Sequence, residues 1–160
     1  MENQERNEKI LKISCGLLEK MGLAVESAFV EDVADEENNV LVGVTVNNPG
    51  SLIGFKGRNL AAVQLVLGLM VKNQLGEWVK VLLDVNNYRA EQKTRLETMA
   101  VGLANKAKET GKMVAMVPMS AYERRICHMA VSEIEGISSE SEGEGEERHI
   151  VIRPIEVATE

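Results

Sequence analysis

Residues 40–60 read VLVGVTVNNPGSLIGFKGRNL, and this stretch decides the fold of the first part of the chain. Valine occupies every second position of its first seven residues, which is the period of a strand with one buried face and predicts a strand over 40–47. Turn residues then end the strand. Two glycines, Gly54 and Gly57, follow directly before an apolar stretch, which predicts a helix over 58–73.

The sequence on both sides of this stretch completes one layer of strands and helices. Apolar residues at helical spacing predict a helix over 5–21, and a weaker strand signal follows over 24–33. Alternation of valine and leucine predicts a last strand over 78–85. The resulting order is helix, strand, strand, short helix, Gly-x-x-Gly, helix, strand. This order predicts an α+β fold with helices on one face of a single sheet.

A second unit is predicted in the rest of the chain. Its expected elements are a helix over 88–110, a short strand over 112–117, a helix over 121–135 and a strand over 149–153. Asn86 or Asn87 can cap the first of these helices, and Ser120 with Glu123 forms a capping box that opens the second. The serine, glutamate and glycine residues over 138–147 have the composition of a solvated loop. We therefore expect domains at 1–86 and 87–155 and a tail at 156–160.

The composition is that of a soluble globular protein, with 44% hydrophobic and 27% charged residues. A net charge of −7 argues against nucleic-acid binding when it is taken alone. The charge is unevenly distributed, however, because residues 51–137 carry 12 basic and 8 acidic side chains, whereas residues 1–50 carry 4 and 10. A locally positive face can bind phosphate on an acidic protein. With 3% aromatic residues, we expect little ring stacking on bases.

Several classes of protein are excluded by what the sequence lacks. The polar N-terminus predicts no signal peptide, and no apolar run approaches the roughly 18 residues of a membrane span, so we expect a cytoplasmic protein without membrane insertion. Cys15 and Cys127 are expected to be free thiols in a reducing compartment, and we expect neither a metal nor a cofactor. Cys127 and His128 are adjacent on a helix and point about 100° apart, so they form no catalytic dyad. With no other nucleophile and base standing out, we expect no enzyme.

Gly54-Phe55-Lys56-Gly57 has the features of a phosphate-binding loop. Glycines let a nucleic-acid backbone approach closely, and the free N–H groups at the start of the next helix favour an anion. Lys56 and Arg58 supply positive charge. The alternative is a plain turn between two helices. The surrounding order of elements is that of the type II KH module, which clamps RNA backbone with such a loop.

Arg124 and His128 form the second candidate site. They lie four residues apart in the capped helix and therefore share a face. Tyr122 and Met129 fall on the apolar stripe predicted for the opposite face, so we expect the pair to project away from the core, with Arg125 to one side. Arginine offers a planar fork of donors to phosphate, and histidine adds a donor or a charge. The alternative is a solvated helix face without a ligand.

At these motifs the sequence resembles the Jag, or SpoIIIJ-associated, family of bacterial proteins. The matching stretches are residues 53–60, 84–89, 118–128, 139–146 and 148–154. The third of them is similar to the signature of the R-3-H domain, which is named for its Arg-x-x-x-His motif and binds single-stranded nucleic acid. The resemblance implies a type II KH domain followed by a small α/β R-3-H domain. It assigns backbone binding to Gly54–Gly57 and a second phosphate contact to Arg124 and His128.

The resemblance also implies a function and partners. It implies a single-stranded RNA-binding protein of the bacterial cytoplasm, acting as a post-transcriptional regulator or RNA chaperone linked to cell division or elongation. Implied protein partners are another KH protein or a second copy of the chain, with an indirect link to a membrane-protein insertase. No residues here match the small N-terminal domain of many members, and Phe55 stands where members commonly have a basic residue, which predicts a weaker hold on phosphate. The alternative function is a protein-interaction module, with the apolar helix 58–73 as its surface and RNA binding incidental.

Overall fold

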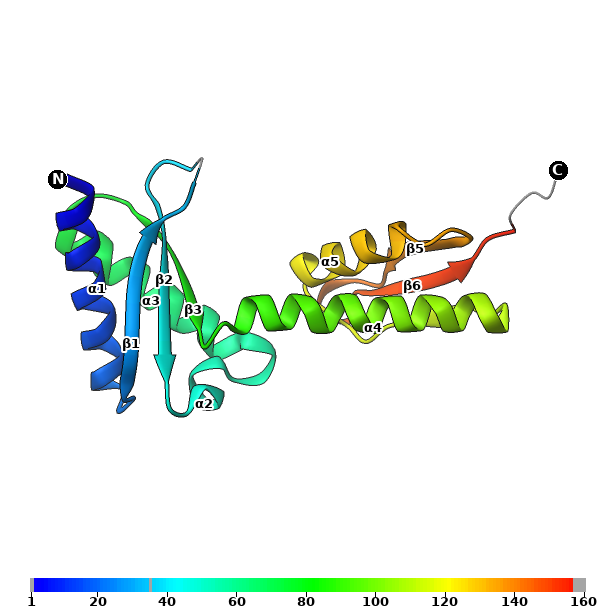
Figure 1. The fold of residues 1–160 in the computed structure, drawn as a ribbon, viewed down its shortest axis with the longest axis horizontal. Helices are drawn as coiled ribbons and strands as arrows, with labels where there is room; N and C mark the ends of the chain where they lie inside the picture. The colour runs from blue at the N-terminus through cyan, green and yellow to red at the C-terminus, as the bar shows by residue number, and fades with distance from the viewer. Residues whose placement is uncertain (1, 35, 157–160) are drawn as a thin grey trace. The chain divides into compact units, whose positions relative to one another are not determined.

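The structure, a computed structural model, describes residues 2–34 and 36–156 and divides into two units, Met1–Arg89 and Ala90–Glu160 (Figure 1). The expected tail at 156–160 lies outside the described residues, apart from Glu156. Each unit has its own sheet and its own hydrophobic core. The chain is thus a mixed α+β protein.

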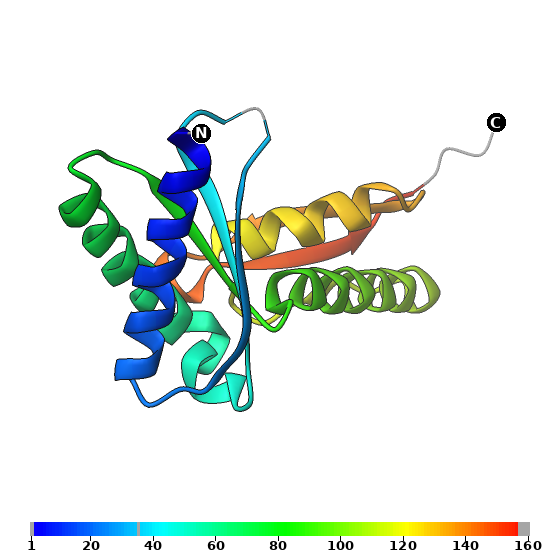
Figure 2. The ribbon, with the colours of Figure 1, turned by 60° about the vertical axis from the view of Figure 1, so that its left-hand side comes forward.

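The first unit contains three helices and three strands in the predicted order. They are α1 (Glu2–Lys20), β1 (Val25–Asp32), β2 (Asn39–Val46), α2 (Pro49–Ile53), α3 (Arg58–Leu75) and β3 (Lys80–Val85), with the turn η1 (Phe55–Gly57) between α2 and α3. The strands lie in the order β1-β2-β3, with β1 antiparallel and β3 parallel to β2. Figures 1 and 2 both show α1 and α3 side by side against this sheet.

The alternating residues of the strands build the core of the first unit, as predicted. The buried side chains of the sheet, with Val79 just before β3, are Val40, Val42, Val44, Val46, Val79, Val81, Leu83 and Val85. α1 adds Ile10 and Leu18, and α3 adds Leu60, Leu67 and Val71. Phe55 and Lys56 of the turn η1 and Arg58 at the start of α3 are exposed and therefore accessible.

The segment from α2 to α3 corrects the expectation about apolar runs. Among the described residues, Pro49–Leu75 is long and apolar enough to cross a membrane by length and composition. The expectation failed because α3 is apolar on its outer side as well as on its core side. A core helix of a folded domain passes the same test, and α3 packs Leu60, Leu67 and Val71 into the core.

The second unit is built from two helices and a second three-stranded sheet. Its elements are α4 (Tyr88–Thr110), β4 (Val114–Ala115), α5 (Ala121–Ser132), β5 (Ile137–Glu142), the turn η2 (Gly145–Glu147) and β6 (His149–Pro154), with α4 starting in the last residues of the first unit. The strands lie in the order β4-β6-β5 and are all antiparallel. Both α4 and α5 contribute to the core, which also contains Ile150 and Ile152 of β6.

The expectation of a solvated loop over 138–147 was wrong, because its first half is the strand β5. Ser139 and Ser141 point to the side of the sheet that carries α5, since both contact a side chain of that helix. Glu140 and Glu142 point to the other side and pair with Arg153 of β6. The serines and glutamates of β5 are therefore held in a strand by pairing with β6. Composition alone does not reveal this pairing.

The start of α4 also differs from the expectation. Asn86 does not cap the helix, because its side-chain amide accepts a hydrogen bond from the Val46 N–H and donates one to the Val46 carbonyl. The carboxylate of Asp84 instead accepts from the N–H of Arg89 in the first turn of α4. By contrast, the predicted capping box of α5 is confirmed: Ser120 and Glu123 accept from each other's backbone N–H groups.

The two cysteines differ in their surroundings, and this predicts different reactivity. Cys127 is fully buried, and burial followed by the nearby Glu123 raises the pKa of its thiol to about 11. Cys15 is half-buried, and burial raises its pKa as well. Because the thiolate is the reactive form, we expect Ellman's reagent to modify Cys15 in the native protein and Cys127 only after unfolding. A native Cys15→Ser variant that still reacts rapidly would contradict this burial.

Candidate nucleic-acid interface

The loop between α2 and α3 is held in a conformation that its glycines permit. Gly54, Lys56 and Gly57 have φ angles of 70°, 52° and 77°. A Cβ at Gly54 would lie 2.5 Å from the side-chain Cγ of Asn59, so no other residue fits there without rearrangement. A Cβ at Gly57 would lie 3.5 Å from the ring of Tyr88, an ordinary contact, so its positive φ is the main reason for glycine.

Contacts from three elements fix the shape of this loop. The Asn59 side chain of α3 donates to the carbonyl of Ser51 in α2 at 2.9 Å. The ring of Tyr88, the first residue of α4, lies beside Gly57. The next residue, Arg89, donates to Gln64 Oε1 at 2.9 Å and to the carbonyl of Leu83 at 3.1 Å, which ties this turn of α4 to α3 and β3. The loop is thus shaped before any ligand binds.

The loop presents two cations, an exposed ring and a helix N-terminus together. Phe55 is 71% exposed, and the ammonium of Lys56 and the guanidinium of Arg58 lie 5.4 and 5.9 Å from the centre of its ring. These distances are within the range of cation–π attraction. No side chain caps the start of α3, whose first N–H groups and dipole favour an anion. The arrangement suits a phosphate group.

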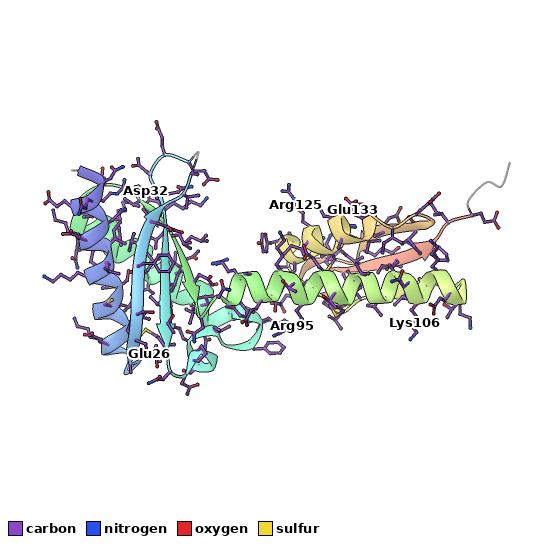
Figure 3. The ribbon with its side chains drawn as sticks, in the orientation of Figure 1. Glu26, Asp32, Arg95, Lys106, Arg125 and Glu133 are labelled. Atoms are coloured by element: carbon purple, nitrogen blue, oxygen red, sulfur yellow. The ribbon has the colours of Figure 1, made fainter. Side chains whose placement is uncertain are left out.

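The second motif lies in α5. Arg125 is exposed and points away from the helix (Figure 3). Arg124 is half-buried, and its Nε atom is buried without a hydrogen-bond partner among the residues that the structure describes. The predicted apolar stripe was partly wrong, because Tyr122 and Met129 are exposed and Cys127 is buried instead.

His128 does not project freely into solvent, which corrects the expectation. It is half-buried and faces β5, where Nδ1 lies 2.7 Å from Ser139 Oγ and Nε2 lies 3.1 Å from Ser141 Oγ. Burial, and then the charge of Arg124, lower the pKa of its imidazole, which favours the neutral form at pH 7. Neither serine was predicted to contact His128. The two-residue spacing of Ser139 and Ser141 could have indicated them, because it places both side chains on one face of a strand.

The described residues contain no group of three or more histidine, cysteine, aspartate or glutamate side chains that could hold a metal ion. The candidate contacts are therefore cations, hydroxyl groups and backbone N–H groups. Such donors bind phosphate groups without further chemistry.

Comparisons with known proteins support the domain expected around the second motif and the family resemblance. The protein-family model described as the R-3-H domain matches residues 94–154, which include all of α5. Relatives named RNA-binding protein KhpB are 33% identical over 149 residues in Bacillus subtilis strain 168, 34% over 136 residues in Clostridium symbiosum and 30% over 159 residues in Streptococcus pneumoniae. These alignments cover 91%, 85% and 84% of this chain.

The chain matches only part of each relative. It covers 72% of the Bacillus protein, 60% of the Clostridium protein and 48% of the Streptococcus protein. The match to the Bacillus protein extends over nearly the whole chain, and the R-3-H match accounts for the second unit. The resemblance drawn from the motifs is thereby confirmed, and the chain belongs to the KhpB family, also called the Jag family.

Proposed function

We propose that this chain binds single-stranded RNA through two phosphate-binding sites, one in each unit. The observation that carries the proposal is the loop Gly54–Gly57, whose left-handed backbone sets two cations beside the uncapped start of α3. The name of the relatives, RNA-binding protein KhpB, supports RNA as the ligand. Binding and release of RNA is the whole activity that we propose, without a catalytic step.

The first unit is, in this proposal, a type II KH domain over 1–86. Its order α1-β1-β2-α2-α3-β3, with Gly-x-x-Gly between the last two helices, supports this assignment. KH domains clamp the nucleic-acid backbone with this loop. The contacts we assign to it are Gly54, Phe55, Lys56, Gly57 and Arg58.

The second unit contributes the second site, within an R-3-H domain over 87–155. We assign its phosphate contact to Arg124, with Arg125 beside it and His128 acting through the hydroxyl groups of β5. Arg124 supports this role because its buried Nε lacks a partner within the described part of the chain. The cellular role that we propose is that of a cytoplasmic post-transcriptional regulator or RNA chaperone. Links to cell division, elongation and a membrane-protein insertase rest on the family resemblance alone.

A competition experiment tests the preference for single strands. A labelled single-stranded RNA is bound to the protein and displaced by the same unlabelled strand or by its duplex. We expect the single strand to displace the label at a lower concentration, because a duplex holds its backbone and bases in a shape that a short loop and one helix face do not match. Displacement by the duplex at equal or lower concentration would contradict single-strand binding.

A second candidate function is self-association through the outer face of α3. Leu65, Val66 and Leu69 on this face are 64%, 46% and 53% exposed. No charged residue stands between Arg58 and Lys72, so the same face of a second copy can pack against it without like-charge repulsion, despite a net charge of −7. Contiguous exposed apolar surface of this kind is typical of interaction sites.

Leu69→Glu is expected to convert such a dimer into a monomer, because it would bring two carboxylates into an apolar contact. Light scattering after size exclusion measures the mass of each species. Gln4→Glu on the exposed side of α1 adds the same charge elsewhere and should leave the dimer intact. A wild-type protein that is monomeric at all concentrations would rule out self-association. In that case, we propose that this face of α3 binds a different KH protein.

A further inference from the structure

The two hydrogen bonds of His128 differ in length, and the difference favours one assignment of the protons. Nδ1 is 2.7 Å from Ser139 Oγ, and Nε2 is 3.1 Å from Ser141 Oγ. The most common heavy-atom distance to an acceptor oxygen is about 2.7–2.8 Å for a hydroxyl donor and about 2.9–3.0 Å for an N–H donor. The distances therefore fit Ser139 donating to Nδ1 and the Nε2–H group donating to Ser141.

With this assignment, the two serines differ in whether the imidazole already uses their hydroxyl proton. The hydroxyl proton of Ser139 is used by the imidazole. The hydroxyl of Ser141 accepts from the imidazole, and its own proton has no other acceptor among the described residues. A hydroxyl that accepts from an N–H group is also a better donor, because consecutive hydrogen bonds polarise one another. Ser141 is half-buried, and the part of its surface that remains exposed can be reached by an anion.

We propose that Ser141 donates a hydrogen bond to an RNA phosphate at the α5 site and that Ser139 is the residue that positions His128 for this contact. The proposal rests on the proposed function and names further residues of the same site. Arg124 lies one turn before His128 on the same helix face, close enough for its charge to act on the imidazole. Its guanidinium, with Nε buried and without a partner in the described residues, supplies the positive charge for the same phosphate.

The acidic residues of β5 are directed away from this site. Glu140 and Glu142 lie on the opposite face of the strand, where their carboxylates are 3.5 and 2.6 Å from the guanidinium of Arg153. The alternation of the strand thus separates hydroxyl groups on one face from carboxylates on the other. A phosphate beside Ser141 would therefore lie next to hydrogen-bond donors, because the glutamates of the strand point to its other face.

The RNA-binding test compares alanine variants of two serines of β5. We expect Ser141→Ala to weaken the binding of a labelled single-stranded RNA by roughly tenfold, the lower end of the effect of one hydrogen bond to a charged oxygen. Ser141→Thr keeps the hydroxyl and should restore most of the affinity. Ser138→Ala is the matched control, because Ser138 lies on the other face of β5 and donates to the carbonyl of Arg153 at 3.5 Å.

A nuclear magnetic resonance measurement tests the positioning role independently of RNA. Long-range correlations between ring protons and ring nitrogens report which nitrogen of His128 is protonated. We expect the Nε2–H form in the wild type and in Ser138→Ala, and a mixture of tautomers in Ser139→Ala, where Nδ1 has lost its donor. A wild type with the proton on Nδ1 would overturn the assignment of Ser141 as the outward donor.

The failures of the two proposals are distinguishable. A wild type that binds no RNA at low salt overturns the proposed function and this inference with it. A wild type whose binding is weakened by Arg124→Ala but not by Ser141→Ala overturns the inference alone. Weakening by Ser141→Ala and Ser138→Ala to the same extent would also overturn it, because the effect would then come from β5 as a whole.

Discussion

Gly57→Asp is expected to weaken RNA binding by roughly tenfold to a hundredfold, the cost of losing one charge-assisted contact and adding a repulsive charge. The glycine has a φ of 77°, and an aspartate there places a side chain and a carboxylate in the loop that is proposed to seat the phosphate. A side chain also prevents close approach of the RNA backbone. Fluorescence anisotropy with a labelled single strand measures the change.

The matched control for this variant is Gly76→Asp. Gly76 has a φ of 76° and lies at the other end of α3, with open space where a Cβ would be placed. The variant carries the same charge and the same backbone strain, so it should lose similar stability and keep its RNA affinity. If Gly57→Asp melts like Gly76→Asp and binds RNA like the wild type, the loop is not the RNA site.

Arg124→Ala is expected to weaken RNA binding by roughly tenfold to a hundredfold, because a guanidinium–phosphate contact contributes about 1.5–3 kcal/mol. Arg124→Lys keeps the charge but not the planar fork and should give an intermediate affinity. Arg124→Ala is not expected to lower the thermal stability, since the buried Nε atom of Arg124 has no hydrogen bond to lose among the described residues.

Lys106→Ala controls for the loss of one positive charge in the same unit. Lys106 lies on the exposed side of α4 and points away from α5, as Figure 3 shows. We expect its removal to change RNA affinity by less than about twofold, through long-range electrostatics alone. Equal effects of Lys106→Ala and Arg124→Ala would mean that net charge, and not a site on α5, determines binding.

The first unit could be predicted almost completely from the sequence, for a physical reason. In β2 and β3, valine and leucine recur at every second position on the buried face, so they mark both these strands and their orientation. The helix α3 was also predicted, but the spacing of its apolar residues did not distinguish its exposed apolar face from the face that packs into the core. Only the packed sheet shows that Leu67 is buried while Leu65 and Leu69 are exposed.

The second unit was harder to predict, because its key strand is polar. β5 is stabilised by pairing with β6 and by contacts of its serines and glutamates with His128 and Arg153, which lie far from it in sequence. Local composition therefore indicated a loop. Because a loop was predicted in place of β5, the serine partners of His128 were not identified and its side chain was predicted to be exposed.

The candidate loop was found through its glycines and cations, whereas the contacts that shape it were not predicted. Asn59 and Tyr88 pack against Gly54 and Gly57 from α3 and α4. Neither belongs to the motif, and Tyr88 is distant in sequence. Sequence reasoning identifies the groups that can bind phosphate more readily than the residues that hold them.

The most direct test of two-site RNA binding is anisotropy of a labelled single-stranded RNA at about 50 mM and about 200 mM salt. The wild type is measured beside Gly57→Asp and the double variant Arg124→Ala/His128→Ala. We expect the wild type to bind at low salt and to lose affinity roughly tenfold at the higher salt, because phosphate contacts are weakened, and we expect both variants to bind more weakly. A wild type that does not bind at the lower salt, or that binds no more tightly than both variants, would contradict two-site RNA binding.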